Sequence, residues 1–83
     1  MWSVYILLCQ DGSFYIGSSN DVRKRFLIHK NGKGGRYTRS HKPIQVVYQE
    51  DYSTKSQALK REAHLKTLTH AQKQALKELS DRG

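Results

Sequence analysis

Cysteine, proline and long apolar runs are all scarce in this chain of 83 residues. Its one cysteine, Cys9, cannot form an intramolecular disulfide and leaves no set of thiols for a structural zinc ion. The longest apolar run, Val4 to Cys9, is far shorter than the roughly 20 residues of a membrane-spanning helix. No secretory signal follows Met1. These absences predict a reduced, cytoplasmic protein that has no membrane partner.

Acidic residues are scarce too: seven Asp and Glu oppose fifteen Lys and Arg, which gives a net charge of +8. The excess is concentrated between Asn20 and Lys42, where Asp21 is the only acid. Such a basic block is typical of a protein that binds a phosphate backbone, although a solvated surface that serves solubility is the alternative. The residues of the block that we expect to contact nucleic acid are Arg23, Lys24, Lys30, Lys33, Arg36, Tyr37, Arg39 and Lys42.

The apolar pattern predicts one α+β domain over residues 1–83, with a thin core, because so short a chain buries only about 60% of its unfolded surface. Runs rich in aromatic and β-branched residues predict strands at residues 3–9, 14–18 and 45–52. Capping residues predict three helices. The first begins at Asn20 or Asp21 and runs to about Lys30, the second begins at Ser53 or Thr54 and runs to about Thr67, and the third begins at Thr69 and runs to about Ser80. We therefore expect a small three-stranded antiparallel sheet flanked by helices (β-β-α-β-α-α), with a basic loop over residues 30–42.

The turn between the first two strands decides which side chains share a face of the sheet. A two-residue Asp-Gly loop would place Tyr5 and Tyr15 on opposite faces. A three-residue loop, Gln10 to Gly12 with Gly12 in the left-handed conformation, would pair Tyr5 with Gly17 and place both tyrosines on one face. We expect the longer loop. Strand tyrosines are commonly core aromatics, so their place alone does not assign a role.

Three polar residues adjoin the apolar faces of the predicted helices. Arg25 and His29 are four residues apart on the first helix, on a row that borders its apolar stripe. A guanidinium there suits a bound phosphate, but it would equally suit a structural contact with Glu62 or with a carbonyl group. Glu62 lies within the apolar stripe of the second helix, where a carboxylate needs a compensating cation. Both Mg²⁺ and the Arg25 guanidinium remain candidates for that cation.

Together these residues resemble the motifs of the GIY-YIG nuclease superfamily over essentially the whole chain. The likeness rests on Val4-Tyr5-Ile6, Tyr15-Ile16-Gly17, Arg25, His29 and the downstream Glu62. It is greatest to the small single-domain bacterial members, which are close in plan to the catalytic domain of structure-selective repair endonucleases. The chain departs from the pattern at Ser3, where the first motif has its glycine, and it lacks the asparagine that some relatives carry on a late helix.

The resemblance implies a GIY-YIG endonuclease fold and metal-dependent hydrolysis of DNA phosphodiester bonds. One Mg²⁺ or Mn²⁺ ion on Glu62 would bind the scissile phosphate, and Arg25 would hold one of its oxygens. Tyr5 would deprotonate the attacking water, assisted by Tyr15 and His29, with Arg25 and the metal lowering its pKa. The implied substrate is branched, flapped or single-stranded DNA in DNA repair, with RNA as an alternative.

Two further hypotheses stay open beside the nuclease. One is a nucleic-acid-binding module of the same fold that does not cut, or cuts only with a protein partner that supplies specificity. The other is a ribosome- or RNA-associated accessory protein with a vestigial site. All three predict binding that weakens steeply with salt. Only the nuclease predicts that one substitution can abolish cutting without loss of binding, while another weakens binding without loss of the cutting chemistry.

Overall fold

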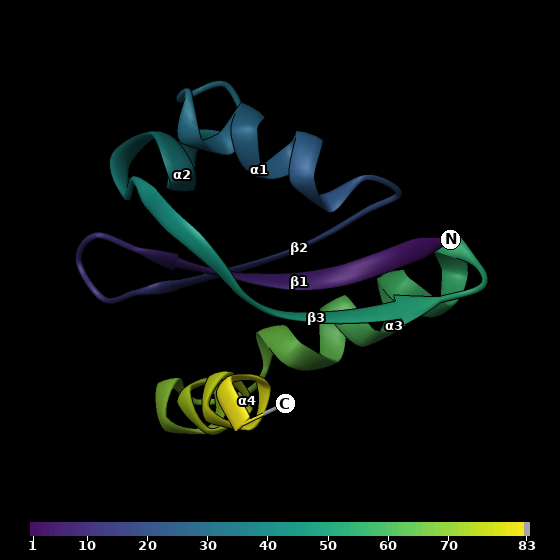
Figure 1. Ribbon diagram of the computed structural model, residues 1–83. Coiled ribbons are helices and arrows are strands. Elements are labelled where there is room, and N and C mark those ends of the chain that lie inside the picture. The colour runs from purple at the N-terminus through teal and green to yellow at the C-terminus, as the bar shows by residue number, and fades with distance from the viewer. Residues whose placement is uncertain (83) are drawn as a thin grey trace.

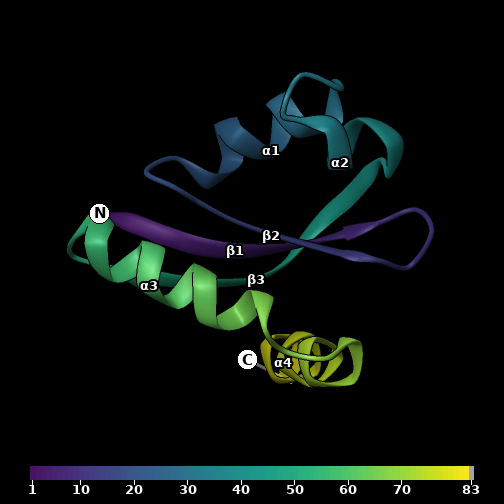
Figure 2. The same cartoon turned by 180° about the vertical axis from the view of Figure 1, so that it is seen from behind.

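The computed structural model describes residues 1–82 and contains one antiparallel sheet with the strand order β2-β1-β3. The strands are β1 (Trp2–Cys9), β2 (Phe14–Ser19) and β3 (Pro43–Tyr52). The helices are α1 (Val22–Lys30), α2 (Arg36–Ser40), α3 (Lys55–Lys66) and α4 (His70–Arg82). In Figures 1 and 2, α1 and α2 cover one face of the sheet, and α3 and α4 cover the other. The predicted class and the order β-β-α-β-α-α are confirmed, but the segment expected to be a basic loop also forms the short helix α2.

The hairpin between β1 and β2 has the three-residue turn. Gly12 adopts a φ of 84°, and its N–H donates to the Cys9 carbonyl over 2.9 Å. Tyr5 consequently pairs with Gly17, and Leu7 pairs with Tyr15. Because side chains alternate along a strand, this register places both tyrosines on the face covered by α1 and α2.

The main hydrophobic core lies on the opposite face. Val4 and Ile6 of β1 pack there with Ala58 and Leu65 of α3. Fully burying one aliphatic side chain of this size contributes about 1.5–3 kcal/mol, so these contacts fix α3 against the sheet. None of the helices within residues 1–82 is long and apolar enough to cross a membrane.

The ends of the helices follow their capping residues. The Lys24 N–H donates to Asp21 Oδ1 over 3.1 Å, which starts α1. Thr54 and Gln57 form a reciprocal capping box before α3, and Thr69 and Gln72 exchange the same two hydrogen bonds before α4. Of the predicted alternatives, the structure has Asp21 and not Asn20 as the cap of α1, and Thr54 and not Ser53 as the cap of α3. The predicted capping box at Thr69 is confirmed.

An ion-pair network ties α3 to β3. Arg61 Nε donates to Glu50 Oε1 over 2.8 Å, and the hydroxyl groups of Tyr48 and Tyr52 donate to the same carboxylate. Burial alone would raise the pKa of Glu50, but hydrogen bonds from Arg61, Tyr48 and Tyr52 outweigh it and lower the value to about 2. Glu50 is thus a structural carboxylate whose oxygens are fully engaged.

Candidate active site

Tyr5, Tyr15 and His29 meet on the face of the sheet beneath α1. Tyr5 Oη lies 3.2 Å from His29 Nε2, and the Tyr15 ring centroid lies 4.8 Å from that of His29. The second ring nitrogen, Nδ1, is 2.9 Å from Thr38 Oγ1 on α2. Tyr5, His29 and Thr38 are 1% exposed or less, whereas Tyr15 is half-buried. The sequence predicted that the tyrosines and His29 converge, but it carried no signal for Thr38.

Two glycines allow the rings to approach the backbone this closely. A Cβ atom at Gly17 would lie 2.5 Å from Tyr5 Oη, so the Tyr5 ring leans across β2, which is an edge strand. A Cβ atom at Gly34 would lie 2.1 Å from His29 Nδ1. Real Cβ atoms do not approach other heavy atoms this closely, and both positions therefore require glycine. The lack of a side chain at Gly17 lets the Tyr5 hydroxyl reach toward the free edge of the sheet.

Arg25 lies between this cluster and solvent. Its side chain is half-buried, and Nη2 donates to the Gly34 carbonyl over 3.4 Å, a long hydrogen bond. It lines a hollow of about 200 Å³ together with Ser19, Asn20, Lys24 and other residues near the start of α1. The expected inward lean of Arg25 is therefore present, with one side of the side chain open to an anion.

Burial controls the protonation of the central pair. It raises the pKa of Tyr5 to about 12, helped by the nearby Tyr15 and Glu62, while Arg25 acts in the opposite direction. Arg25 thus lowers the pKa of Tyr5 as expected, but burial outweighs it. Burial and then the Arg25 charge lower the pKa of His29. At neutral pH the cluster therefore holds a protonated phenol against a neutral imidazole.

Glu62 approaches from the other face of the sheet. Its Oε1 accepts from Ser18 Oγ over 2.6 Å, and its Oε2 lies 2.9 Å from Lys66 Nζ, one helical turn further along α3. Its side chain is 17% exposed. The alternative of a structural pair between Glu62 and Arg25 is wrong, because α3 and α1 lie on opposite faces and Lys66 supplies the compensating charge. The spacing of four residues was the available signal for Lys66.

The residues at Glu62 fit a hard cation that keeps most of its water. Within residues 1–82, no group of three or more His, Cys, Asp and Glu side chains could hold a metal ion. A single partly exposed carboxylate beside a hydroxyl is nevertheless an ordinary donor set for Mg²⁺, which binds through one or two carboxylates together with substrate phosphates. Zinc, which needs several nitrogen or sulfur ligands, does not fit this site.

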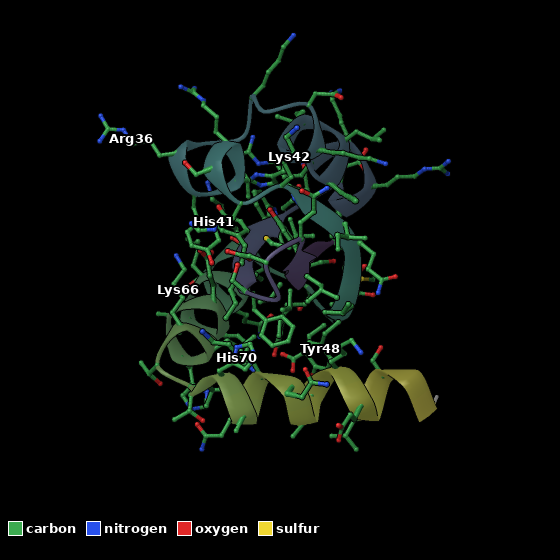
Figure 3. The ribbon with its side chains drawn as sticks, turned by 90° about the vertical axis from the view of Figure 1, so that its left-hand side faces the viewer. Arg36, His41, Lys42, Tyr48, Lys66 and His70 are labelled. Atoms are coloured by element: carbon green, nitrogen blue, oxygen red, sulfur yellow. The ribbon has the colours of Figure 1, made fainter. Side chains whose placement is uncertain are left out.

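The edge of β2 lies between the two parts of the site, which are the cluster of Tyr5, Tyr15 and His29 under α1 and the Glu62 carboxylate on α3. Tyr15 and Gly17 face α1, whereas Ser18 faces Glu62. A second hollow of about 200 Å³ opens beside this edge. Its lining residues are Phe14, Tyr15, Ile16, Tyr37, Lys66 and Lys73. Figure 3 shows Arg36, His41, Lys66 and His70 along one side of the molecule, from α2 down to α4. The second half of the chain thus adds Lys66 and Lys73 to a surface that the sequence pattern assigned to the basic block alone.

The basic block itself divides between two surfaces. Arg23 and Lys30 line a groove of about 400 Å³ between α1 and β3, whose other members include the half-exposed Leu27 and Ile44. The other candidate contacts in the block are exposed: Lys24, Lys33, Arg36, Tyr37, Arg39 and Lys42. Tyr37 stacks on His41, with ring centroids 4.3 Å apart, and on Tyr15 at 5.8 Å. The groove that Arg23 and Lys30 line thus shares no lining residue with the hollow beside the β2 edge or with the hollow at Arg25.

The stability of the protein should fall as the pH drops below about 6.5, the ordinary pKa of histidine. Folding lowers the pKa of His29. The contribution of the neutral His29 to the free energy of unfolding is therefore complete above pH 6.5 and is lost as the pH falls through the lower pKa of the folded state. Urea unfolding followed by the fluorescence of Trp2 at pH 7.5 and pH 5.5 measures this loss. His29→Gln should lose less stability than the wild type over the same pH interval. Equal losses in both proteins would contradict the assignment of this loss to His29.

The two carboxylates whose pKa values fall to about 2 do not obscure this window. Hydrogen bonds from Ser13 and His41 lower the pKa of Asp11 to about 2, and that of Glu50 is also about 2. Their contributions are complete above about pH 4.5, the ordinary range of carboxyl groups, and are lost only at lower pH.

Comparison with known proteins identifies the family. The model of the GIY-YIG catalytic domain matches residues 1–75. A UPF0213 protein of Staphylococcus epidermidis is 54% identical over 70 residues, which are 84% of this chain and 85% of that protein. A UPF0213 protein of Staphylococcus saprophyticus is 49% identical over the same shares of both chains.

Two solution NMR structures are similar to this chain. The UPF0213 protein BH0048 from Bacillus halodurans has a TM-score of 0.58 and 39% identity, over 95% of this chain and 85% of that one. The protein EF2693 from E. faecalis has a TM-score of 0.59 and 42% identity, over 93% and 83% of the two chains. The chain thus belongs to the GIY-YIG family of nuclease domains, among its small single-domain bacterial members.

Proposed function

We propose that this protein is a divalent-metal-dependent endonuclease that hydrolyses DNA phosphodiester bonds. Residues 1–83 would form its single catalytic domain. The convergence of Tyr5, His29, Arg25 and Glu62 around one free sheet edge is the observation that carries the proposal. Structural ion pairs such as that of Glu50 have all their partners within the fold. The Arg25 side chain, by contrast, borders a hollow open to solvent. That exposure favours a ligand over a purely structural role.

Arg25 is the group that we assign to the scissile phosphate. Its guanidinium can donate to two phosphate oxygens at once and keeps its charge at any physiological pH. Lys24, which shares its hollow, adds a second positive charge. A phosphate bound at Arg25 would also offset the charge that disfavours a proton on His29. Substrate binding would therefore make His29 a better proton acceptor.

Glu62 is the residue that would hold one Mg²⁺ or Mn²⁺ ion. When bound, such an ion neutralises charge on the phosphoryl oxygens of the substrate. Lys66 now occupies Glu62 Oε2, so its ammonium group competes with a metal ion for the same carboxylate. The second hollow, which Lys66 and Lys73 line, offers a place where a released Lys66 would meet phosphate.

Tyr5 is the group that we assign to the proton of the attacking water, with His29 behind it. In this step the water gives a proton to Tyr5 Oη as Tyr5 gives its own to His29 Nε2. The water oxygen forms a bond to phosphorus, and the bond from phosphorus to the leaving nucleotide oxygen breaks. Solvent protonates the leaving oxygen, and His29 later returns its proton to solvent. Tyr15, half-buried against the His29 ring, would help to position the water.

The exposed cations of residues 23–42 and the pair Lys66 and Lys73 would bind the flanking phosphates without reading bases. Selection would then depend on the shape of the DNA, and we place the enzyme in cytoplasmic DNA repair. The substrates that we expect are branched, flapped or single-stranded DNA, with RNA as the alternative.

Cleavage of end-labelled single-stranded, duplex, flapped and branched DNA tests the proposal. The purified protein is incubated with Mg²⁺, with Mn²⁺ or with EDTA. We expect metal-dependent cutting that favours one shape, whichever base sequence surrounds the junction. Equal cutting in EDTA would exclude the metal, and equal cutting of all shapes would exclude the selectivity.

A second candidate is a nucleic-acid-binding module that cuts only with a protein partner. The observation that favours it is the burial of Tyr5, which is 1% exposed and whose pKa is raised to about 12. In this candidate, a partner opens the cluster and brings water to this phenol. Salt-sensitive binding without cutting under any metal would support this candidate instead.

The double variant Lys33→Ala with Arg36→Ala should weaken DNA binding across all sequences. Each phosphate that is no longer neutralised reduces the slope of log K against log salt by about 0.9 on duplex DNA, so the slope should flatten by about 2. Fluorescence anisotropy with labelled DNA at salt concentrations of about 50 to 200 mM measures this slope.

Lys55→Ala with Lys60→Ala is the matched control, since it removes the same two charges from exposed positions on α3. The control should bind like the wild type. The cleavage rate at saturating DNA should be unchanged in both variants. An equal fall in the affinity of the control would show that only net charge matters and that the basic block does not touch the DNA.

A further inference from the structure

Thr38 is a buried polar residue to which the proposed mechanism gives no part. It lies on α2, is 1% exposed, and places Oγ1 2.9 Å from His29 Nδ1. On the same short helix Arg36 and Arg39 point to solvent. A neutral imidazole has one donor and one acceptor nitrogen, and the Thr38 hydroxyl can pair with either, so the partner of the other ring nitrogen decides where the proton of His29 lies.

The partners of Tyr5 decide that question. The Tyr5 hydroxyl is buried and protonated, so its hydrogen needs an acceptor inside the protein. Arg25, the charged neighbour on one side, carries only donors. His29 Nε2, at 3.2 Å, is therefore the acceptor and must be free of hydrogen. The ring proton then lies on Nδ1 and is donated to Thr38 Oγ1.

Gly34 keeps the ring from escaping this arrangement. The backbone at Gly34 lies so close to the ring that even a Cβ atom would come within 2.1 Å of Nδ1 and 2.6 Å of Cγ. The ring cannot swing toward Gly34, and the Tyr15 ring lies beside it, tilted by 57°. The hydrogen bond to Thr38 thus acts on a ring that is already held in place.

We infer that Thr38 is a positioning residue that keeps the proton of His29 on Nδ1 and leaves Nε2 open to receive the proton of Tyr5. The use of that open nitrogen in catalysis rests on the proposed nuclease function. The location of the proton does not, since it follows from the hydrogen bonds alone. If the proton moved to Nε2, His29 would donate to Tyr5 and could no longer accept from it.

The ¹⁵N chemical shifts of the His29 ring nitrogens test the inference directly. At pH 7.5 we expect a protonated Nδ1 and an unprotonated Nε2 in the wild type and in Thr38→Ser, which keeps the hydroxyl. Thr38→Val keeps the shape but leaves the Nδ1 proton without its acceptor, so in it we expect the proton to move to Nε2, where Tyr5 Oη can accept it. A wild-type ring protonated on Nε2 would overturn the inference, and this readout needs no variant to fold.

Cleavage kinetics provide the second readout. Thr38→Val should lower kcat by about 10-fold to 100-fold, as the loss of a group that orients a functional histidine commonly does, with KM unchanged. Thr38→Ser should restore most of the rate. A fall in kcat without a change of tautomer would show a merely structural role and overturn the inference. If the wild type does not cut at all, the proposed function fails, while the NMR result still decides the place of the proton.

Discussion

Replacement of Glu62 by glutamine is expected to lower the rate of DNA cleavage by about 10³-fold, the size of the loss when one preorganised charge-stabilising group is removed. Glutamine keeps an oxygen that can accept from Ser18, so α3 should stay in place. It removes the negative charge that would hold the metal ion. Cleavage of the preferred DNA in Mg²⁺ measures the rate, and calorimetric titration with Mn²⁺ should show that metal binding is abolished.

Glu78→Gln is the matched control, because it removes the same charge from an exposed position on α4. It should cut and bind metal like the wild type. DNA affinity of Glu62→Gln should be unchanged or slightly tighter, since a negative charge near the substrate is gone. Wild-type cleavage by Glu62→Gln would refute the assignment of the metal to this carboxylate.

Replacement of Tyr5 by phenylalanine should lower kcat by about 10²-fold to 10⁴-fold, the usual contribution of general acid–base catalysis. The ring still fills its site over Gly17, but the hydroxyl that passes the proton to His29 is gone. The buried Nε2 then lacks its partner, which costs about 1–3 kcal/mol of stability. Single-turnover cleavage with excess protein measures the chemical step, and anisotropy should show unchanged DNA affinity.

Tyr15→Phe provides the matched comparison, because the two tyrosines adjoin the same imidazole. We expect a smaller fall in kcat than in Tyr5→Phe, since Tyr15 approaches His29 with its ring and the substitution keeps that ring. The reverse order of effects would assign the water proton to the half-exposed Tyr15. Equal wild-type rates in both variants would remove both phenols from the mechanism.

The face of the sheet that carries Tyr5 and Tyr15 could be predicted because local rules determine it. The length of the turn at Gly12 fixes the register, and the alternation of side chains then brings both tyrosines under α1. The spacing of four residues places Arg25 and His29 on one row of α1. The capping boxes at Thr54 and Thr69 likewise depend on neighbours in the sequence.

The partners of Glu62 and the role of Thr38 could not be predicted in the same way. Local pattern showed that Glu62 lies on the inward side of its helix, but not that α3 packs on the face opposite α1. Because α3 packs on that face, Glu62 pairs with Lys66 and not with Arg25. Thr38 lies in a segment whose charge and glycines suggested a loop, and only the folding of α2 directs its hydroxyl to His29.

The alternation along β2 has a consequence for how such domains can diverge. Tyr15 and Gly17 serve one half of the site, and Ser18 serves the other. A lineage that deleted Gln10 from the turn would keep its charge and both motif tripeptides, yet would exchange the two sets of side chains. Selection should therefore tolerate new residues at Gln10 or Asp11 far more readily than a change in the number of residues between the two strands.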